Sequence, residues 1–183
     1  QTLQYRQQLS ALSRCVGWGC TPVFPHGSRH NVPNPECPSG GCVNEVFLLH
    51  GTTVEGLAGI LQSGFDNTRS GQRNGRFFGS GIYFADEACK CDSYTQAESG
   101  QRTIVLARVC LGEAWFALSP KPDMKNPPDG FCAVVGESKD NGGVLDFREY
   151  VVYEGTQALP MYLIHYKHGI RCSCTRCKFS SPR

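Results

Sequence analysis

The chain has 183 residues, of which 18 are Lys or Arg and 16 are Asp or Glu, so its formal charge is +2 at pH 7. This length suits one globular domain with a core of its own. The charge is too mild to indicate a nucleic-acid surface, which would need a clustered basic face, and no apolar run approaches the length of a membrane span. We therefore expect neither nucleic acid nor a membrane as a partner.

The first part of the chain shows little regular pattern. Residues 3–16 could form a short helix with apolar residues along one side. Residues 17–44 are rich in Gly, Pro, Asn and Ser, which indicates an irregular extension. The polar N-terminus lacks the apolar stretch of a signal peptide, which favours an intracellular protein and leaves a secreted one open.

Regular elements begin with an apolar strand over residues 46–50, VFLLH. A short amphipathic helix is expected within residues 52–65, with Thr52 or Thr53 as its cap and Gly64 at its end. The residues expected to line one side of this helix are Leu57, Ile60 and Leu61.

The middle of the chain alternates loops with strand patterns. Residues 66–76 predict a polar loop with three arginines, and residues 81–85 a strand. Residues 86–98 indicate a helix with Asp86 as a plausible cap. Residues 119–130 contain four prolines and cannot be regular. Further strands are expected within residues 102–116 (one long strand or a pair), 132–136, 148–154 and 161–166. This order predicts an α+β fold of packed, mostly antiparallel sheets.

Three of the expected strands carry a polar residue that a ligand could reach. His50 ends the first strand, Tyr83 lies within the second, and Glu149 opens a later apolar strand. Gly79 and Gly81 leave room for a group to approach the backbone beside Tyr83. Each residue alone has an ordinary interpretation, as a polar strand cap, an aromatic strand residue or a solvated strand end. Together the three could meet in one cleft.

Motifs around these residues occur in a specific order: LLHGT, GSGIYFAD-x3-K-x3-Y, PPDGFCAVVG and EYVVYEGTQALPMYLIHY. They resemble the catalytic domain of the poly(ADP-ribose) polymerase family, and the tankyrase branch looks most similar. The resemblance runs from about Val46 to about Tyr166. It implies the ADP-ribosyltransferase fold, with two small β-sheets around a cleft for the co-substrate NAD⁺.

The resemblance implies a role for each matching residue. His50 would hydrogen-bond the 2′-hydroxyl of the adenosine ribose, and Gly51 would offer its backbone to the nicotinamide amide. Tyr83 and Tyr94 would stack on the two faces of the nicotinamide. Glu149 would stabilise a transition state that resembles an oxocarbenium ion.

The implied activity is transfer of ADP-ribose from NAD⁺ to a protein acceptor, which could be the protein itself, or to a growing ADP-ribose chain. Nicotinamide is released in this reaction. The resemblance makes His50, Tyr83 and Glu149 the family's His-Tyr-Glu triad. A glutamate in its third position permits chain elongation without establishing it. Two other functions stay open: an NAD⁺ glycohydrolase, and a non-catalytic module that binds NAD⁺ or ADP-ribose.

The sequence also departs from the family pattern near the nicotinamide. Cys91, preceded by Lys90, stands where the family usually has a serine bonded to the nicotinamide carboxamide, and a thiol is a weaker donor. The loop of residues 66–76, the arginine loop, falls where the family has its donor loop over NAD⁺. Arg69, Arg73 or Arg76 could therefore meet the pyrophosphate.

Eleven cysteines are unusual for a chain of this length. Cys110 and Cys132 lie in apolar sequence and are expected to be buried. The segment TQAESGQR is too short for the zinc loop of the tankyrase type and contains no cysteine.

A structural zinc site could lie elsewhere, at the two ends of the chain. Three cysteines in the tail have compatible spacing, at Cys172, Cys174 and Cys177. The candidates for a fourth ligand are Cys15, Cys20, Cys37, Cys42 and His168. Disulfides in an oxidising compartment and free thiols are the alternatives.

We therefore expect one ADP-ribosyltransferase catalytic domain over residues 1–183. It would comprise a cysteine-containing extension (1–45), a catalytic core (46–167) and a cysteine-rich tail (168–183).

Overall fold

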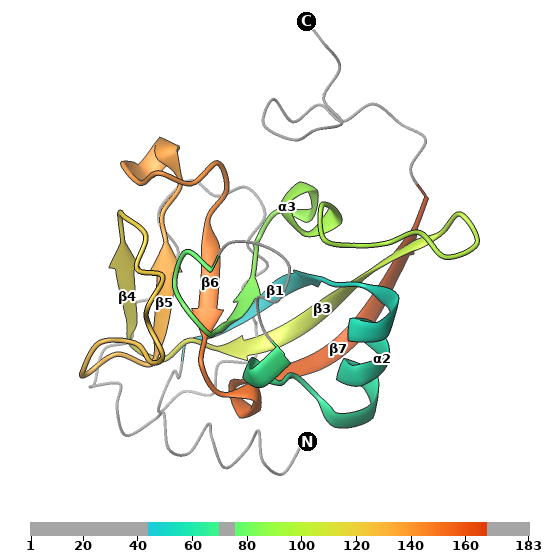
Figure 1. Cartoon of the computed structure of the whole chain (residues 1–183), viewed down its shortest axis with the longest axis horizontal. Helices are drawn as coiled ribbons and strands as arrows, with labels where there is room; N and C mark the ends of the chain where they lie inside the picture. The colour runs from blue at the N-terminus through green and yellow to red at the C-terminus, as the bar shows by residue number, and fades with distance from the viewer. Residues whose placement is uncertain (1–43, 70–75, 168–183) are drawn as a thin grey trace, which may run out of the picture.

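The computed structural model describes residues 44–69 and 76–167, with the side chain of Arg69 left out (Figure 1). The helix expected at residues 3–16, the irregular extension and the cysteine-rich tail lie outside these residues. The division of the chain into extension, core and tail therefore stays a prediction.

The described residues form seven strands in two sheets. The strands are β1 (Glu45–Gly51), β2 (Ile82–Phe84), β3 (Arg102–Cys110), β4 (Ala114–Ala117), β5 (Ala133–Gly136), β6 (Glu149–Val152) and β7 (Ala158–Tyr166). One sheet has the order β1-β3-β7 and the other the order β2-β6-β5-β4. All pairs are antiparallel except β4 with β5. The expected α+β fold with two mostly antiparallel sheets is confirmed.

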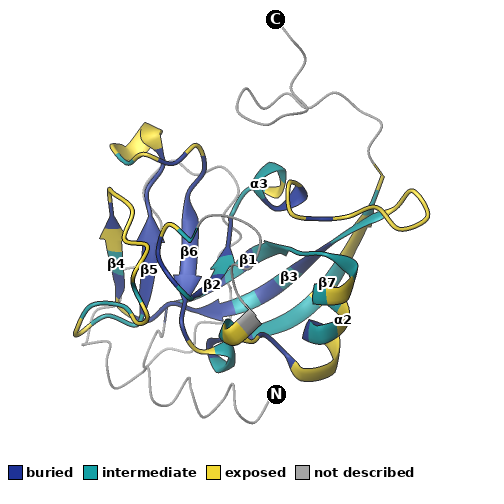
Figure 2. Cartoon of the chain, in the orientation of Figure 1, coloured by how far each residue is buried: buried dark blue, intermediate teal, exposed yellow. Residues whose placement is uncertain are grey.

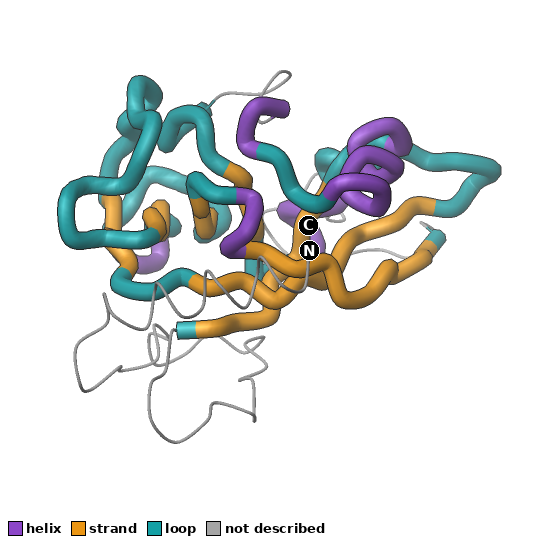
Figure 3. The backbone as a smooth tube through the Cα atoms, turned by 90° about the horizontal axis from the view of Figure 1, so that it is seen from below, coloured by secondary structure: helices purple, strands orange, loops and turns teal. Residues whose placement is uncertain are grey.

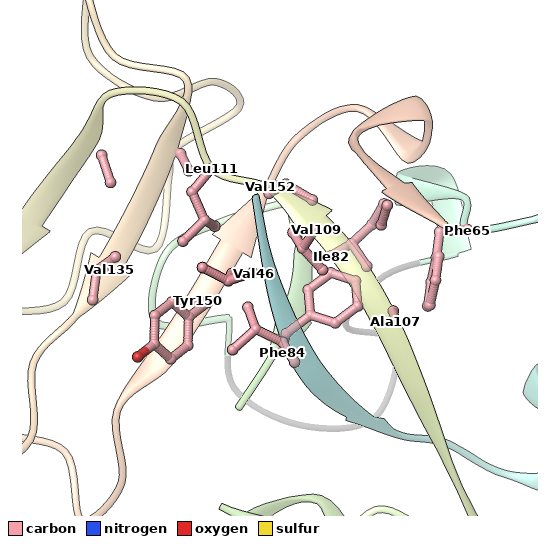
Figure 4. Packing of buried hydrophobic residues seen from close by; sticks show 14 of the residues in the cluster. Val46, Phe65, Ile82, Phe84, Ala107, Val109, Leu111, Val135, Tyr150 and Val152 are labelled. Carbon is pink, nitrogen blue, oxygen red and sulfur yellow. The ribbon is translucent and has the colours of Figure 1, made fainter. Parts of the chain in front are cut away.

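The two sheets enclose the main hydrophobic core. In β1, Val46 and Leu48 are buried and their neighbours are less so, as expected for a strand with one covered face. In β6 every residue is buried, because this strand lies inside its sheet. Both sheets supply the central cluster, with Val46, Ala107 and Val109 from one and Phe84, Tyr150 and Val152 from the other (Figure 4). Figure 2 shows the same core as a dark band along β5, β6 and β3.

The segment expected to be one strand or two is a pair. β3 and β4 belong to different sheets, and the turn between them passes through Gly112 with φ 55°. The chain therefore crosses from one sheet to the other at this glycine. Cys110, at the end of β3, is fully buried as expected, but Cys132 is only partly buried, because it precedes β5 at the end of a loop.

Helix α2 (Val54–Ser63) packs on the three-stranded sheet (Figures 1 and 3). The side chain of Thr53 caps it by accepting a hydrogen bond from Gly56 N–H at 3.2 Å, and Gly64 ends it with φ 85°. Ile60 is buried, but Leu61 is 55% exposed. The expectation that Leu61 shares the buried side is wrong, because one residue turns the helix by about 100°.

Helix α3 (Ala88–Asp92) is shorter than the helix expected over residues 86–98. Glu87 occupies the N-cap position without a side-chain cap bond. Asp86 is therefore not the cap; its carboxylate instead accepts a hydrogen bond from the Tyr150 hydroxyl. In the described part of the chain, no helix is both long enough and apolar enough to cross a membrane.

Candidate active site

A cleft of about 950 Å³ opens between α2, α3 and the ends of β1, β2 and β6. The structure brings seven of the candidate residues to its walls. These are His50, Gly51, Tyr83, Lys90, Cys91, Tyr94 and Glu149.

Strand pairing explains why residues so distant in sequence meet here. Tyr83 pairs with Val151 across β2 and β6. Because side chains alternate along a strand, Glu149 projects from the same face as Val151 and therefore as Tyr83. Leu49 exchanges two backbone hydrogen bonds with Ala85, at 2.8 and 2.9 Å, which brings the end of β1 to this face.

His50 is held in one tautomer by the backbone. Its Nδ1 lies 2.8 Å from the Tyr83 carbonyl oxygen. A carbonyl can only accept, so Nδ1 carries the proton and donates, and Nε2 of the neutral ring is an acceptor. Burial lowers the pKa of His50, and the bond to the Tyr83 carbonyl offsets only part of this. Near pH 7 the ring is neutral and can accept a hydrogen bond from a hydroxyl group.

Two aromatic rings fix the plane of the His50 imidazole. Phe65 meets it edge to face, with ring centroids 5.2 Å apart, and Phe84 lies at 5.5 Å with a tilted ring. These apolar neighbours also explain why the charged form of His50 is disfavoured.

Gly51 allows β1 and α3 to touch. A Cβ at this position would lie 1.9 Å from the carbonyl oxygen of Cys91, which is far inside contact distance. Within this chain, therefore, the reason for glycine is the approach of the α3 backbone.

Tyr83 is anchored by its hydroxyl group. The hydroxyl donates to the Gly79 carbonyl at 2.9 Å and accepts from Phe78 N–H at 3.0 Å. Burial raises the pKa of Tyr83, so the hydroxyl stays neutral. The nearby glycines were expected to leave room for a group to approach the backbone. At Gly79 this group is the Met124 carbonyl, which a Cβ there would overlap.

Glu149 forms a buried ion pair with Lys90. Its Oε1 lies 2.6 Å from the Lys90 Nζ, and its side chain is 5% exposed, so it is not a solvated strand end. Its Oε2 is buried and has no hydrogen-bond partner among the described residues. One carboxylate oxygen is therefore fixed by Lys90, and the other keeps its capacity to accept a hydrogen bond.

Lys90 stays charged in this setting. Burial lowers its pKa, but the neighbouring Glu149 carboxylate raises it by more, so the net pKa lies above the ordinary value. Its Nζ also lies 5.5 Å from the centre of the Tyr94 ring, within cation–π range. Lys90 thus connects Glu149 with one of the two expected stacking residues.

Cys91 is 3% exposed and packs against Ala85 and Ile104. Burial raises the pKa of its thiol to about 12, so the group is neutral and unreactive near pH 7. It is a weak hydrogen-bond donor in the wall of the cleft and not a nucleophile.

Comparison with known proteins gives this cleft a family. The sequence model of the poly(ADP-ribose) polymerase catalytic domain matches residues 27–142, which is more than half of the chain. The chain belongs to this family. The match includes β1 to β5, and the family resemblance inferred from the motifs is confirmed.

Three relatives show the range of the family that this chain resembles. It is 31% identical over 137 residues to protein mono-ADP-ribosyltransferase PARP12 of Homo sapiens, covering 74% of this chain and 19% of the relative. It is 29% identical over 174 residues to poly [ADP-ribose] polymerase 2 of Zea mays, covering 79% of this chain and 26% of the relative. It is 28% identical over 160 residues to poly [ADP-ribose] polymerase tankyrase of Caenorhabditis elegans, covering 68% of this chain and 7% of the relative.

This member of the family therefore spans about a quarter or less of the length of these three relatives. Their names include both mono-transferring and polymer-forming proteins, at similar identities. The placement nearest to the tankyrase branch stays a prediction.

The arginine loop of this polymerase-family chain is only partly described. Arg76 donates to Ser80 Oγ at 3.1 Å and is not among the described residues that line the cleft. Arg73 and the side chain of Arg69 lie outside the described part. Within the described lining, Lys90 is the only Lys or Arg, beside the acidic Glu55, Asp66 and Glu149.

Sequence reasoning missed several parts of the cleft of this family member. The start of α2 lines the cleft through Thr52, Thr53 and Gly56, which was not predicted from the sequence. The pairing of Lys90 with Glu149 was not predicted either. The position of α2 directly after His50 and Gly51 could have suggested the first of these. Nothing in the sequence indicates the second, because a salt bridge leaves no local pattern.

The cysteines proposed as zinc ligands lie outside the described residues. Within residues 44–69 and 76–167, no group of three or more His, Cys, Asp or Glu side chains is arranged to hold a metal ion.

Proposed function

We propose that this protein is an NAD⁺-dependent ADP-ribosyltransferase that transfers ADP-ribose to a protein acceptor or a growing ADP-ribose chain and releases nicotinamide. The observation that carries this proposal is the state of Glu149. It is a buried carboxylate in the wall of a cleft that also contains His50 and Tyr83, with one oxygen held by Lys90 and the other without a hydrogen-bond partner among the described residues.

The chemistry of transfer requires such a group. The bond between the ribose C1′ and nicotinamide breaks, and its electron pair leaves with nicotinamide. Positive charge develops on the ribose, and a fixed carboxylate beside it stabilises charge that exists mainly in the transition state. The acceptor oxygen then bonds to C1′ and loses its proton. Removal of one preorganised charge-stabilising group commonly costs roughly 10²–10³ in rate.

The other wall residues bind and orient the substrate. The Nε2 of His50 is an acceptor for a ribose hydroxyl, because its Nδ1 is committed to the Tyr83 carbonyl. Tyr83 and Tyr94 supply aromatic surface for the nicotinamide, which adds about 0.5–1.5 kcal/mol beyond burial. Lys90 holds Oε1 of Glu149, which directs Oε2 to the substrate.

The arginine loop supplies positive charge for the pyrophosphate in this proposal. Support comes from the charges of the described lining, where Lys90 stands against three carboxylates: Glu55, Asp66 and Glu149. A diphosphate substrate needs further positive charge. Arg69, Arg73 and Arg76 remain the candidates.

We further infer that the cysteine-rich ends bind structural zinc and that the protein is intracellular. The first inference rests on the spacing of Cys172, Cys174 and Cys177. The second follows from the first, because cysteines that bind a metal as thiolates are typical of a reducing compartment. The acceptor is a protein of unspecified identity, with the chain itself as one candidate.

One assay separates the proposed transferase from its alternatives. The protein is incubated with NAD⁺ labelled in the adenosine, with and without an added protein acceptor, and both nicotinamide and protein-bound label are measured. A transferase releases nicotinamide and labels protein. Nicotinamide without protein-bound label would indicate a glycohydrolase, and saturable NAD⁺ binding without either product would indicate a binding module.

A further inference from the structure

A buried chain of polar side chains runs behind the cleft. The Oε2 of Glu137 accepts from Nε and Nη2 of Arg148, at 3.1 and 3.0 Å. The Nη1 of Arg148 donates to the Tyr150 hydroxyl at 3.5 Å, and this hydroxyl donates to Oδ2 of Asp86 at 3.1 Å. Glu137, Arg148 and Tyr150 are 6%, 5% and 0% exposed. Groups buried so deeply destabilise a fold unless they are paired.

This chain lies on the opposite side of β6 from the cleft. Arg148 and Tyr150 flank Glu149, and side chains alternate along a strand. Glu149 therefore faces the cleft, whereas Tyr150 faces the core between the sheets, with its hydroxyl oxygen at the outer end of the cluster (Figure 4). The proposed chemistry does not use any of these core-facing polar groups.

The partner of Tyr150 lies just before the helix that carries Lys90. Asp86 precedes α3 by two residues. The segment 86–92 is thus joined to β6 twice: Lys90 meets Glu149 on the cleft side, and Asp86 meets Tyr150 on the core side. At its far end the segment is joined to β7, where the Tyr166 hydroxyl donates to Asp92 at 2.5 Å.

Helix α3 needs such contacts, because a helix of five residues has little stability of its own. The Tyr150–Asp86 bond fixes the start of the segment against β6. Without that bond, α3 could shift, and the 2.6 Å contact between Lys90 and Glu149 would lengthen. Small displacements at a catalytic group can reduce rates strongly.

We propose that Tyr150 and Asp86 are positioning residues, which hold α3 against β6 so that Lys90 fixes Glu149 for the transfer; this inference rests on the proposed function. Arg148 and Glu137 support the pair from the other side, since Arg148 donates to the same hydroxyl. Neither Tyr150 nor Asp86 lies among the described residues that line the cleft.

The test uses Tyr150→Phe, which removes the hydroxyl and keeps the ring in the core. We expect kcat to fall about tenfold, KM for NAD⁺ to stay within about twofold, and amide hydrogen exchange to speed up within residues 86–92. Tyr162→Phe, on the 62% exposed Tyr162, is the matched control and should change none of these.

Substitutions at the acceptor side complete the test. Asp86→Asn keeps an oxygen that can accept from Tyr150 and should retain activity within about threefold. Asp86→Ala should match Tyr150→Phe, and the double variant should be no worse than the poorer single variant, because both remove the same Tyr150–Asp86 bond.

Three results would overturn the proposal. The first is a Tyr150→Phe variant with the kcat of the wild type. The second is a loss of kcat in Asp86→Asn as large as in Asp86→Ala. The third is faster hydrogen exchange over the whole protein and not mainly in residues 86–92. A wild-type protein without transfer activity would instead refute the proposed function. The exchange measurement would then still decide whether the Tyr150–Asp86 pair holds α3.

Discussion

The behaviour of the cleft depends on which atoms of its buried residues are already occupied. The Nδ1 of His50 and the Oε1 of Glu149 are both bonded to protein groups. The Nε2 of His50 is left as an acceptor, and the Oε2 of Glu149 has no partner among the described residues. At this scale the fold holds two side chains that each keep one acceptor atom, and the proposed function assigns these acceptors to substrate hydroxyl groups.

The neutral state of His50 predicts a pH dependence of stability. Its pKa in the folded protein lies below the ordinary value of 6.5, so the unfolded chain binds the proton more tightly. The contribution of the neutral His50 ring to the free energy of unfolding is therefore fully present above pH 6.5. It is lost as the pH falls from there through the lowered pKa. Over that window we expect the free energy of unfolding to fall by up to about 1.4 kcal/mol per pH unit.

The measurement compares denaturant unfolding of the wild type and His50→Asn between pH 8 and pH 5. The variant lacks the titrating ring and should lose less stability in acid. Parallel curves for the two proteins would show that the pKa of His50 does not differ between the folded and unfolded states.

The thiol of Cys91 in the cleft wall gives a second prediction. Cys91→Ser replaces a weak donor with a hydroxyl, and we expect nicotinamide-like inhibitors to bind more tightly by about 0.5–1.5 kcal/mol, the value of one neutral hydrogen bond. Calorimetry would measure the change. Cys132→Ser, at a cysteine outside the described lining, is the control. Equal affinities in Cys91→Ser and the wild type would mean that this side chain does not meet the ligand.

At the scale of elements, the cleft depends on how closely β1, β6 and α3 approach one another. Gly51 lets β1 touch the backbone of α3. Lys90 in α3 and Asp86 just before it each pair with a side chain of β6. A helix of five residues thus carries Lys90, Cys91 and the turn to Tyr94 only because its neighbours hold it.

Gly51→Ala tests this close approach. The added methyl group would overlap the Cys91 carbonyl, so we expect α3 to be displaced, with a loss of about 1–3 kcal/mol in stability and a large loss of NAD⁺ binding. Gly100→Ala is the control, since a Cβ there meets nothing within 4 Å and costs only the strain of φ 77°. Comparable NAD⁺ affinity in the two variants would contradict the role given to Gly51.

Much of this arrangement could be predicted from local patterns, and some could not. The strands and α2 follow from apolar periodicity and from caps such as Thr53 and Gly64. The ends of α3 could not be predicted in this way. Asp86 looks like a cap but is bonded to Tyr150, which lies 64 residues away. Contacts of this kind depend on how the sheets meet, and the sequence near Asp86 has no trace of them.

The same limit applies to the candidate site. His50, Tyr83 and Glu149 could be named because motifs surround them and the family places them together. The ion pair between Lys90 and Glu149 depends on side chains from α3 and β6, and its geometry emerges only when both are folded.

At the scale of the whole molecule, two small sheets share one core and open a cleft at one end. The cysteines at the ends of the chain lie outside the described residues. If they bind zinc, the metal would join the N-terminal extension and the tail around the core, and its binding energy would become folding energy.

Zinc is tested by elemental analysis and by chelation. We expect about one or two zinc ions per chain, by the usual four-ligand coordination, and a strong chelator should lower the melting temperature. Early activity at low temperature should persist, because the described cleft lining includes none of these terminal cysteines. Metal-free protein with an unchanged melting temperature and oxidised cysteines would refute the zinc proposal and favour disulfides.

The central claim is that Glu149 stabilises the charge that develops during transfer. Glu149→Gln keeps the shape of the side chain and removes its charge. The decisive measurement is the single-turnover rate of ADP-ribose transfer beside the dissociation constant for NAD⁺, in the wild type and in this variant. The account predicts that the rate falls by about 10²–10³ while the dissociation constant changes by less than about threefold. A rate within a few-fold of the wild type, or equal losses in rate and binding, would contradict it.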